Sequence, residues 1–183
     1  MTIPGKVLIV EDMIVQAMRL QQVLATAGVT TTKVVKSGQE ALSLLGEDQS
    51  WDVVISDVNM PEMDGFELCK RLKSQPQTKQ IPVLLLVSLK DAAEPIKALQ
   101  YGADNFLVKE YEKEYFVPQL NAALENAKAS DGVESQPFNV FYNGAWHEIN
   151  RPASQVAALM TAAYSMAMRE KSARHREPAA SKP

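Results

Sequence analysis

The chain has 183 residues, of which 46% are hydrophobic, and a formal net charge of −3. This length suits one ordinary domain with an appendage, and the small net charge offers no electrostatic argument for nucleic-acid binding. The apolar runs are too short to span a bilayer, the first strand follows the N-terminus too closely for a signal peptide, and the single cysteine, Cys69, cannot form an intrachain disulfide. These features predict a cytoplasmic protein that binds neither membranes nor nucleic acid.

Short apolar runs alternate with amphipathic stretches over the first two-thirds of the chain, which is typical of a parallel sheet with helices on both faces. In chain order, the pattern predicts a strand over 6–10, a helix over 14–27, a strand over 31–35, a helix over 38–45 ended by Gly46, and a strand over 52–56. Next come a helix ending near Ser74, a strand over 83–87, a helix opened by the capping box Asp91-x-x-Glu94, a strand over 105–108 and a helix over 112–128. Five strands and five helices in this order predict an α/β, flavodoxin-like parallel sheet of strand order 2-1-3-4-5.

The pattern changes after residue 129, where 130–137 is predicted to be a linker between a domain over 1–129 and a C-terminal segment. Within 138–168, Asn143-Gly144 between two β-rich runs predicts a β-hairpin, and the apolar spacing after Pro152 predicts an amphipathic helix. The charged tail 169–183 has too few apolar residues to fold, so we expect disorder there. One helix cannot bury its own apolar stripe. We therefore expect it to pair with a second copy in a homodimer, with packing back on the first domain as the alternative.

Polar side chains stand at the carboxyl ends of four predicted strands. Glu11 and Asp12 follow the first strand, Asp57 the third, Ser88 the fourth and Lys109 the fifth. Ligands of open parallel sheets bind at these ends. A buried strand that delivers one carboxylate to its tip, and then breaks into a loop marked by proline and glycine, indicates chemistry at Asp57 rather than packing alone.

This set of residues resembles the receiver domain of two-component response regulators, over roughly residues 3–129. The residues that carry the resemblance are Glu11-Asp12, Asp57 with Met60-Pro61 and Asp64-Gly65, Ser88, Gly102-Ala103-Asp104, and Phe106 three places before Lys109. One such motif is weak evidence, whereas all of them in the expected order are a specific signal. The resemblance implies a phosphoacceptor signalling switch whose Asp57 receives a phosphoryl group from a histidine kinase or a histidine phosphotransfer protein.

The three acidic residues of this set predict a metal site. Carboxylates of Glu11, Asp12 and Asp57 in one pocket would repel one another, so the pocket should recruit a hard divalent cation. Mg²⁺ suits it, because this ion takes a few carboxylate oxygens and keeps waters for itself and a phosphate. The resemblance adds the backbone carbonyl of Asn59 as a further ligand.

The remaining residues have predicted roles around the phosphoryl group. The carboxylate of Asp57 can attack in line and form an aspartyl phosphate. The metal, the Lys109 ammonium and the Ser88 hydroxyl would then each contact a phosphoryl oxygen, since positioning and charge neutralisation are most of what phosphoryl transfer needs. The resemblance further implies that Ser88 moves towards the phosphoryl group and that Phe106 rotates inward, which changes the face that partners bind.

Two positions depart from the family pattern. Leu89 follows Ser88, where the family usually has a small residue that leaves the phosphoryl group accessible, so we expect Leu89 to modulate access. Glu110 follows Lys109, where a proline is common. A cis bond before a residue other than proline costs about 2.5–4 kcal/mol, so we expect a trans bond there.

Three other functions compete with the phosphoacceptor switch. The first is a receiver fold that acts by protein contact without phosphorylation. The second is the N-terminal part of a longer hybrid histidine kinase. The third is a phosphatase or hydrolase with a nucleophilic aspartate. Such enzymes usually carry a second acid two residues after the nucleophile, where this chain has Asn59, so we expect no enzyme activity beyond self-catalysed phosphorylation and dephosphorylation.

Overall fold

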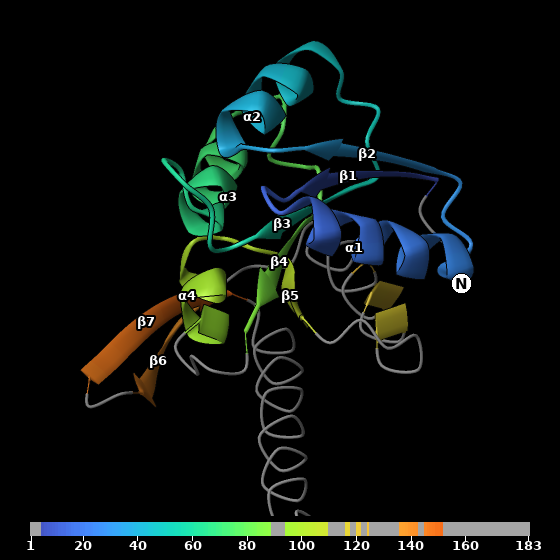
Figure 1. Ribbon diagram of the computed structural model, residues 1–183. Helices are drawn as coiled ribbons and strands as arrows, with labels where there is room; N and C mark the ends of the chain where they lie inside the picture. The colour runs from blue at the N-terminus through green and yellow to red at the C-terminus, as the bar shows by residue number, and fades with distance from the viewer. Residues whose placement is uncertain are drawn as a thin grey trace, which may run out of the picture.

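The computed structural model describes residues 5–88, 94–109, 116–117, 120–121, 124, 136–142 and 145–151, the last two ranges as backbone. Five parallel strands form one sheet in the order β2-β1-β3-β4-β5 (Figure 1). The strands are β1 (Lys6–Val10), β2 (Thr31–Val35), β3 (Val53–Asp57), β4 (Val83–Val87) and β5 (Asn105–Val108). The helices are α1 (Ile14–Ala27), α2 (Gly38–Glu47), α3 (Gly65–Ser74) and α4 (Glu94–Gln100), and residues 116–117, 120–121 and 124 are also helical. The predicted flavodoxin-like fold and its strand order are confirmed.

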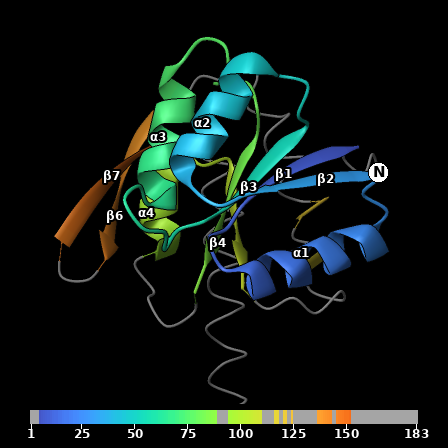
Figure 2. The same cartoon turned by 45° about the horizontal axis from the view of Figure 1, so that its top comes forward.

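Each face of the sheet has its own hydrophobic core, because alternate residues of a strand point to opposite faces. On one face, Leu8 and Leu85 belong to a cluster that includes buried residues of α2, α3 and α4. On the other face, Ile9 and Ile55 pack with α1 and with Phe116. Figure 2 shows α2 and α3 on one side of the sheet and α1 on the other. The sheet is therefore covered on both faces, and its carboxyl edge is left for the polar strand ends.

The end of α2 differs from the prediction. The helix does not stop before Gly46 but continues to Glu47, and Asp48 follows it in an extended conformation. The side-chain amide of Gln49 donates to the carbonyls of Leu45 and Gly46, at 3.0 Å in each case. These bonds satisfy two carbonyls that a helix end leaves without partners, so the glycine is accommodated inside the helix.

The predicted third strand is shifted by one residue. β3 runs over Val53–Asp57, so Asp57 is itself the last residue of the strand. Asp52 is not part of the strand, and its Oδ2 accepts hydrogen bonds from the backbone N–H groups of Gly5 and Lys6, at 2.7 and 2.8 Å. This carboxylate therefore fixes the start of β1 beside the start of β3.

The C-terminal segment contains the predicted hairpin. β6 (Gln136–Tyr142) and β7 (Ala145–Arg151) pair antiparallel, and β7 contacts α4. Each strand extends two residues beyond the predicted β-rich run, so β6 begins inside the predicted linker. The predicted turn at 143–144, the predicted helix after Pro152 and the tail 169–183 lie outside the described residues, and these features and the domain boundaries stay predictions. In the described part of the chain, no helix has the length and apolar character needed to cross a membrane.

Candidate functional site

Three carboxylates meet at the carboxyl edge of the sheet. Glu11 and Asp12 follow β1, and Asp57 ends β3, the strand that pairs with β1. One carboxylate oxygen from each residue lies within 4.8 Å of those from the other two. Glu11 and Asp57 are buried, with 1% and 2% of their surface exposed, and Asp12 is less buried. The structure thus brings together the three acids that the sequence placed at neighbouring strand ends.

Asp57 is held from two directions. The Lys109 ammonium, at the end of β5, lies 2.6 Å from Asp57 Oδ1, and the backbone N–H of Asn59 donates to the same oxygen at 3.0 Å. The Lys109 side chain is 20% exposed, so the ion pair is shielded from water mainly on the Asp57 side. Both contacts fall on Oδ1, and in the described part of the chain no hydrogen bond engages Oδ2. The carboxylate is therefore oriented with one oxygen neutralised and the other available.

Glu11 is the acid whose state is most altered by folding. Its Oε1 accepts a hydrogen bond from the backbone N–H of Met13 at 3.1 Å, whereas the buried Oε2 has no hydrogen-bond partner. Burial, followed by repulsion from Asp57, raises the pKa of Glu11 from 4.5 to about 7. A buried carboxylate oxygen without a partner, beside two further carboxylates, matches the oxygen ligand set that Mg²⁺ prefers. The residues present therefore fit a magnesium ion.

The loop after β3 depends on a glycine. A Cβ on Gly65, the first residue of α3, would overlap the carbonyl oxygen of Asp57 and lie 2.9 Å from its carbonyl carbon. The Gly65 N–H donates to the carbonyl of Val58 at 3.0 Å, and the carboxylate of Asp64 caps α3 by accepting from the N–H of Glu67 at 2.7 Å. The Asp64-Gly65 pair thus starts α3 and lets its first turn pass directly against the backbone of Asp57.

The remaining predicted residues are placed as follows. Ser88 directly follows β4, and its backbone N–H donates to the Glu94 carboxylate at 2.6 Å. Phe106 is 3% exposed and belongs to the core on the side of α2, α3 and α4, so its ring is packed inside. Leu89 and Glu110 lie outside the described residues, and their predicted effects stay predictions.

Glu94 is a residue of this region whose long-range partners the sequence does not indicate. Its Oε2 accepts from Ser88 N at 2.6 Å and its Oε1 from the side-chain amide of Asn59 at 3.3 Å. Asp91, the other member of the predicted capping box, lies outside the described residues, so the capping box stays a prediction. The contacts to Ser88 and Asn59 arise because the ends of β3 and β4 are neighbours in the sheet.

Asp104 has a structural role at the opposite edge of the sheet. It is 7% exposed, its Oδ2 accepts from the backbone N–H of Val83 at 2.7 Å, and the Lys73 ammonium lies 2.6 Å away. Lys73 also donates to the carbonyl of Ile81 at 2.8 Å. This acid of the Gly102-Ala103-Asp104 motif therefore binds the end of α3 and the starts of β4 and β5 together, and it does not enter the site.

Comparison with known proteins agrees with this geometry. The family model of the response regulator receiver domain matches residues 7–121. Response regulator PleD of Caulobacter vibrioides is 36% identical over 105 residues, which cover 57% of this chain but only 23% of PleD. The receiver domain of a signal transduction histidine kinase from Syntrophus aciditrophicus is 38% identical with a TM-score of 0.60, covering 70% of this chain and 96% of that one. The chemotaxis response regulator CheY4 of Vibrio cholerae is 34% identical with a TM-score of 0.58, covering 65% and 98%. This chain belongs to the response regulator receiver domains, the phosphoacceptor signalling modules of two-component systems.

Proposed function

We propose that this protein is a phosphorelay switch that takes a phosphoryl group from phosphohistidine onto Asp57. One observation carries the proposal. The Asp57 carboxylate is buried at the tip of β3, lies 2.6 Å from the Lys109 ammonium, and shares a pocket with Glu11 and Asp12. A buried carboxylate with this combination of cationic and anionic neighbours is poorly explained by stability alone, because buried charges contribute little net stabilisation.

The geometry supports attack by the second carboxylate oxygen. Oδ1 of Asp57 is engaged by Lys109 and by the N–H of Asn59, so Oδ2 is the oxygen that can approach phosphorus. Attack forms the O–P bond of the aspartyl phosphate as the N–P bond of phosphohistidine breaks, and the imidazole leaves. As negative charge develops on a phosphoryl oxygen, the Lys109 ammonium can bind that oxygen, and the hydroxyl of Ser88 is proposed to contact another. Glu11, Asp12, Asp57 and the Asn59 carbonyl would hold Mg²⁺, which supplies further neutralisation of phosphoryl charge when it is bound.

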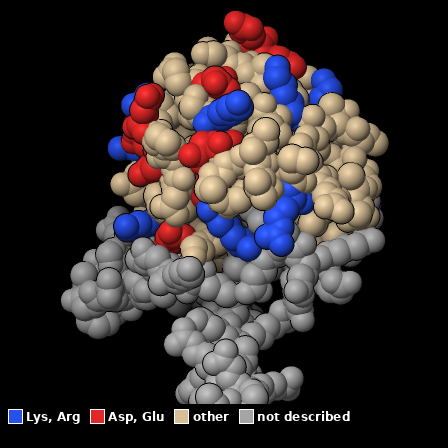
Figure 3. Space-filling model, viewed as in Figure 1, with Lys and Arg blue, Asp and Glu red and all other residues tan. Residues whose placement is uncertain are grey.

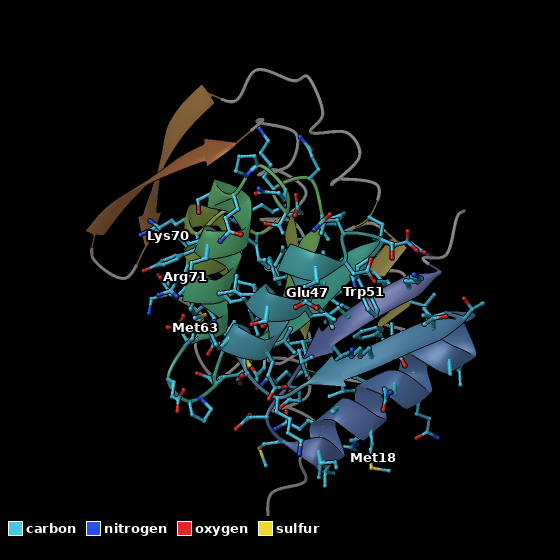
Figure 4. All side chains as sticks on the ribbon, turned by 90° about the horizontal axis from the view of Figure 1, so that it is seen from above. Met18, Glu47, Trp51, Met63, Lys70 and Arg71 are labelled. Carbon is cyan, nitrogen blue, oxygen red and sulfur yellow. The ribbon has the colours of Figure 1, made fainter. Side chains whose placement is uncertain are left out.

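The surface beside the site favours a protein donor. The first turns of α1 and the residue before the helix expose a group of apolar side chains, with between 54% and 65% of each residue exposed: Met13, Ile14, Val15 and Met18. Met18 projects outward from α1 in Figure 4. In Figure 3, charges of both signs are interspersed over α2 and α3, whereas the α1 side is mostly uncharged surface with some basic side chains among it. An apolar surface that adjoins Glu11 and Asp12 is suited to docking the helix or domain that carries the phosphohistidine.

Two alternatives keep some support. Similarity to the receiver domain of a histidine kinase leaves open that this chain is part of a hybrid kinase. A receiver that acts without phosphorylation remains the second alternative, although the intact Asp57–Lys109 pair favours chemistry. Cys69, the single cysteine, is buried in α3, and we place the proposed reaction in a reducing cytoplasm.

Intact mass after incubation with Mg²⁺ and acetyl phosphate tests the proposal. The wild type should gain one labile phosphoryl group, and Asp57→Asn should gain none. Asp48→Asn, an equivalent change on the turn after α2, is the matched control and should label like the wild type. Stoichiometric labelling of Asp57→Asn, or no labelling of the wild type at any Mg²⁺ concentration, would refute the assignment.

A further inference from the structure

A buried glutamate lies beside the site without belonging to the acidic cluster. Glu94 is the first residue of α4 and is 7% exposed. Glutamate is rarely buried unless it is paired. In the described part of the chain, the Glu94 carboxylate forms no ion pair, and its partners are the N–H of Ser88 at 2.6 Å and the amide of Asn59 at 3.3 Å. Two hydrogen bonds therefore compensate the burial of one carboxylate.

The partners of Glu94 belong to two different strand ends. Ser88 follows β4, and Asn59 follows β3, two residues after Asp57. The Asn59 N–H also donates to Asp57 Oδ1 at 3.0 Å. Glu94 therefore links the residues that follow β3 and β4 to the start of α4, and among the described residues it does not bond to Asp57 itself. A favourable charge at a helix start does not require burial, so that role alone does not account for the burial of Glu94.

We infer that Glu94 is a positioning residue that holds the Ser88 backbone and the Asn59 side chain at a fixed separation around the phosphorylation site. This inference rests on the proposed function of Asp57. The Ser88 hydroxyl is useful to phosphoryl transfer only if it is in place as charge develops, because preorganised donors avoid reorganisation during the reaction. Loss of one Glu94 bond should therefore slow the formation of the aspartyl phosphate. It should leave Mg²⁺ affinity within about twofold of the wild type, since among the described residues none of the three clustered carboxylates bonds to Glu94.

Glu94→Gln separates positioning from packing, because glutamine has the same shape. Its amide must turn an NH₂ group towards either the Ser88 N–H or the Asn59 NH₂, so two donors clash unless Asn59 turns its own amide over, and in either case the arrangement around Glu94 changes. In an Asn59→Ala background the glutamine carbonyl can face Ser88 without such a clash, so the same change should have a smaller effect. Glu47→Gln, at the exposed end of α2, is the matched control (Figure 4).

The experiment has two arms. In the first, NMR on the unphosphorylated, metal-free protein follows the Ser88 amide, which should be shifted downfield in the wild type. In Glu94→Gln this amide should move upfield or exchange about tenfold faster, the size expected for loss of a hydrogen bond to a charged group. In the second, the rate of labelling by acetyl phosphate at saturating Mg²⁺ should fall at least about threefold, and the fall should shrink in the Asn59→Ala background.

The two arms distinguish failure of the inference from failure of the proposed function. A Ser88 amide that exchanges as fast in the wild type as an exposed loop amide overturns the inference without any variant having to fold. So does a Glu94→Gln protein that labels at the wild-type rate, or an effect of equal size with and without Asn59. A wild type that takes no phosphoryl group refutes the function of Asp57, whereas the first arm still decides whether Glu94 positions Ser88.

Discussion

Glu11→Gln should stabilise the metal-free protein at pH 8. The wild-type protein buries a Glu11 carboxylate whose Oε2 has no hydrogen-bond partner and whose pKa is raised to about 7, first by burial and then by repulsion from Asp57. Glutamine keeps an oxygen for the N–H of Met13, removes the charge, and places an NH₂ group where a neighbouring carboxylate can accept from it. The gain is therefore the free energy that the wild type loses by ionising Glu11 in the folded state.

The magnitude follows from the pKa. A change from 4.5 to about 7 corresponds to at most about 3–4 kcal/mol, and we expect about 1–3 kcal/mol after relaxation of the site. Because the folded-state pKa is raised, the contribution of Glu11 to stability is fully present below pH 4.5 and is lost as the pH rises through about 7. The advantage of Glu11→Gln should accordingly be largest at pH 8 and should vanish towards pH 4.5.

Urea unfolding in the presence of a chelator, followed by circular dichroism between pH 5 and 8, measures this difference. Glu47→Gln controls for the general effect of losing an acid and should change the free energy of unfolding by less than about 0.5 kcal/mol. Added Mg²⁺ should reverse the order of wild type and Glu11→Gln, because an ion that binds the folded state stabilises the protein that binds it better. If Glu11→Gln loses stability at pH 8 without metal, or if its advantage does not depend on pH, the electrostatic account of Glu11 is wrong.

Three further predictions concern other parts of the chain. Gly65→Ala should lower the free energy of unfolding by about 1–3 kcal/mol and abolish labelling, because its Cβ overlaps the backbone of Asp57. Gly46→Ala, whose Cβ meets nothing within 4 Å, should instead raise the free energy of unfolding by up to about 1 kcal/mol. Equal urea midpoints for the two variants would contradict this. Leu89→Ala should shorten the aspartyl-phosphate lifetime in a timed hydrolysis assay if Leu89 shields the phosphoryl group from water, and an unchanged or longer lifetime would rule out shielding. Light scattering should show a dimer for the full chain and a monomer for a chain ending at Ser130, and two monomers at tens of micromolar would favour packing of the C-terminal helix on its own receiver domain.

Local patterns in the sequence were sufficient for the architecture. Apolar alternation located each described strand to within one or two residues. Because ligands bind at the carboxyl ends of parallel strands, the sequence also predicted that Glu11, Asp12, Asp57 and Lys109 lie at one edge of the sheet. These predictions succeeded because periodicity and connection order depend on neighbours along the chain. The end of α2 was the exception, since Gly46 was expected to stop a helix that Gln49 prolongs.

Tertiary structure alone decided how the groups at that edge interact. The raised pKa of Glu11 depends on burial and on the distance to Asp57, neither of which is a property of a local pattern. The carboxylate of Glu94 bonds to Ser88 and to Asn59, which is 35 residues away in the chain, and no local pattern indicates these two partners. The sequence shows a glycine at position 65, but the reason that a side chain does not fit there is the backbone of Asp57, which belongs to a different element. Which side chains bond between segments depends on their proximity in the folded chain, because a buried group meets its donors and acceptors only after the strands lie side by side.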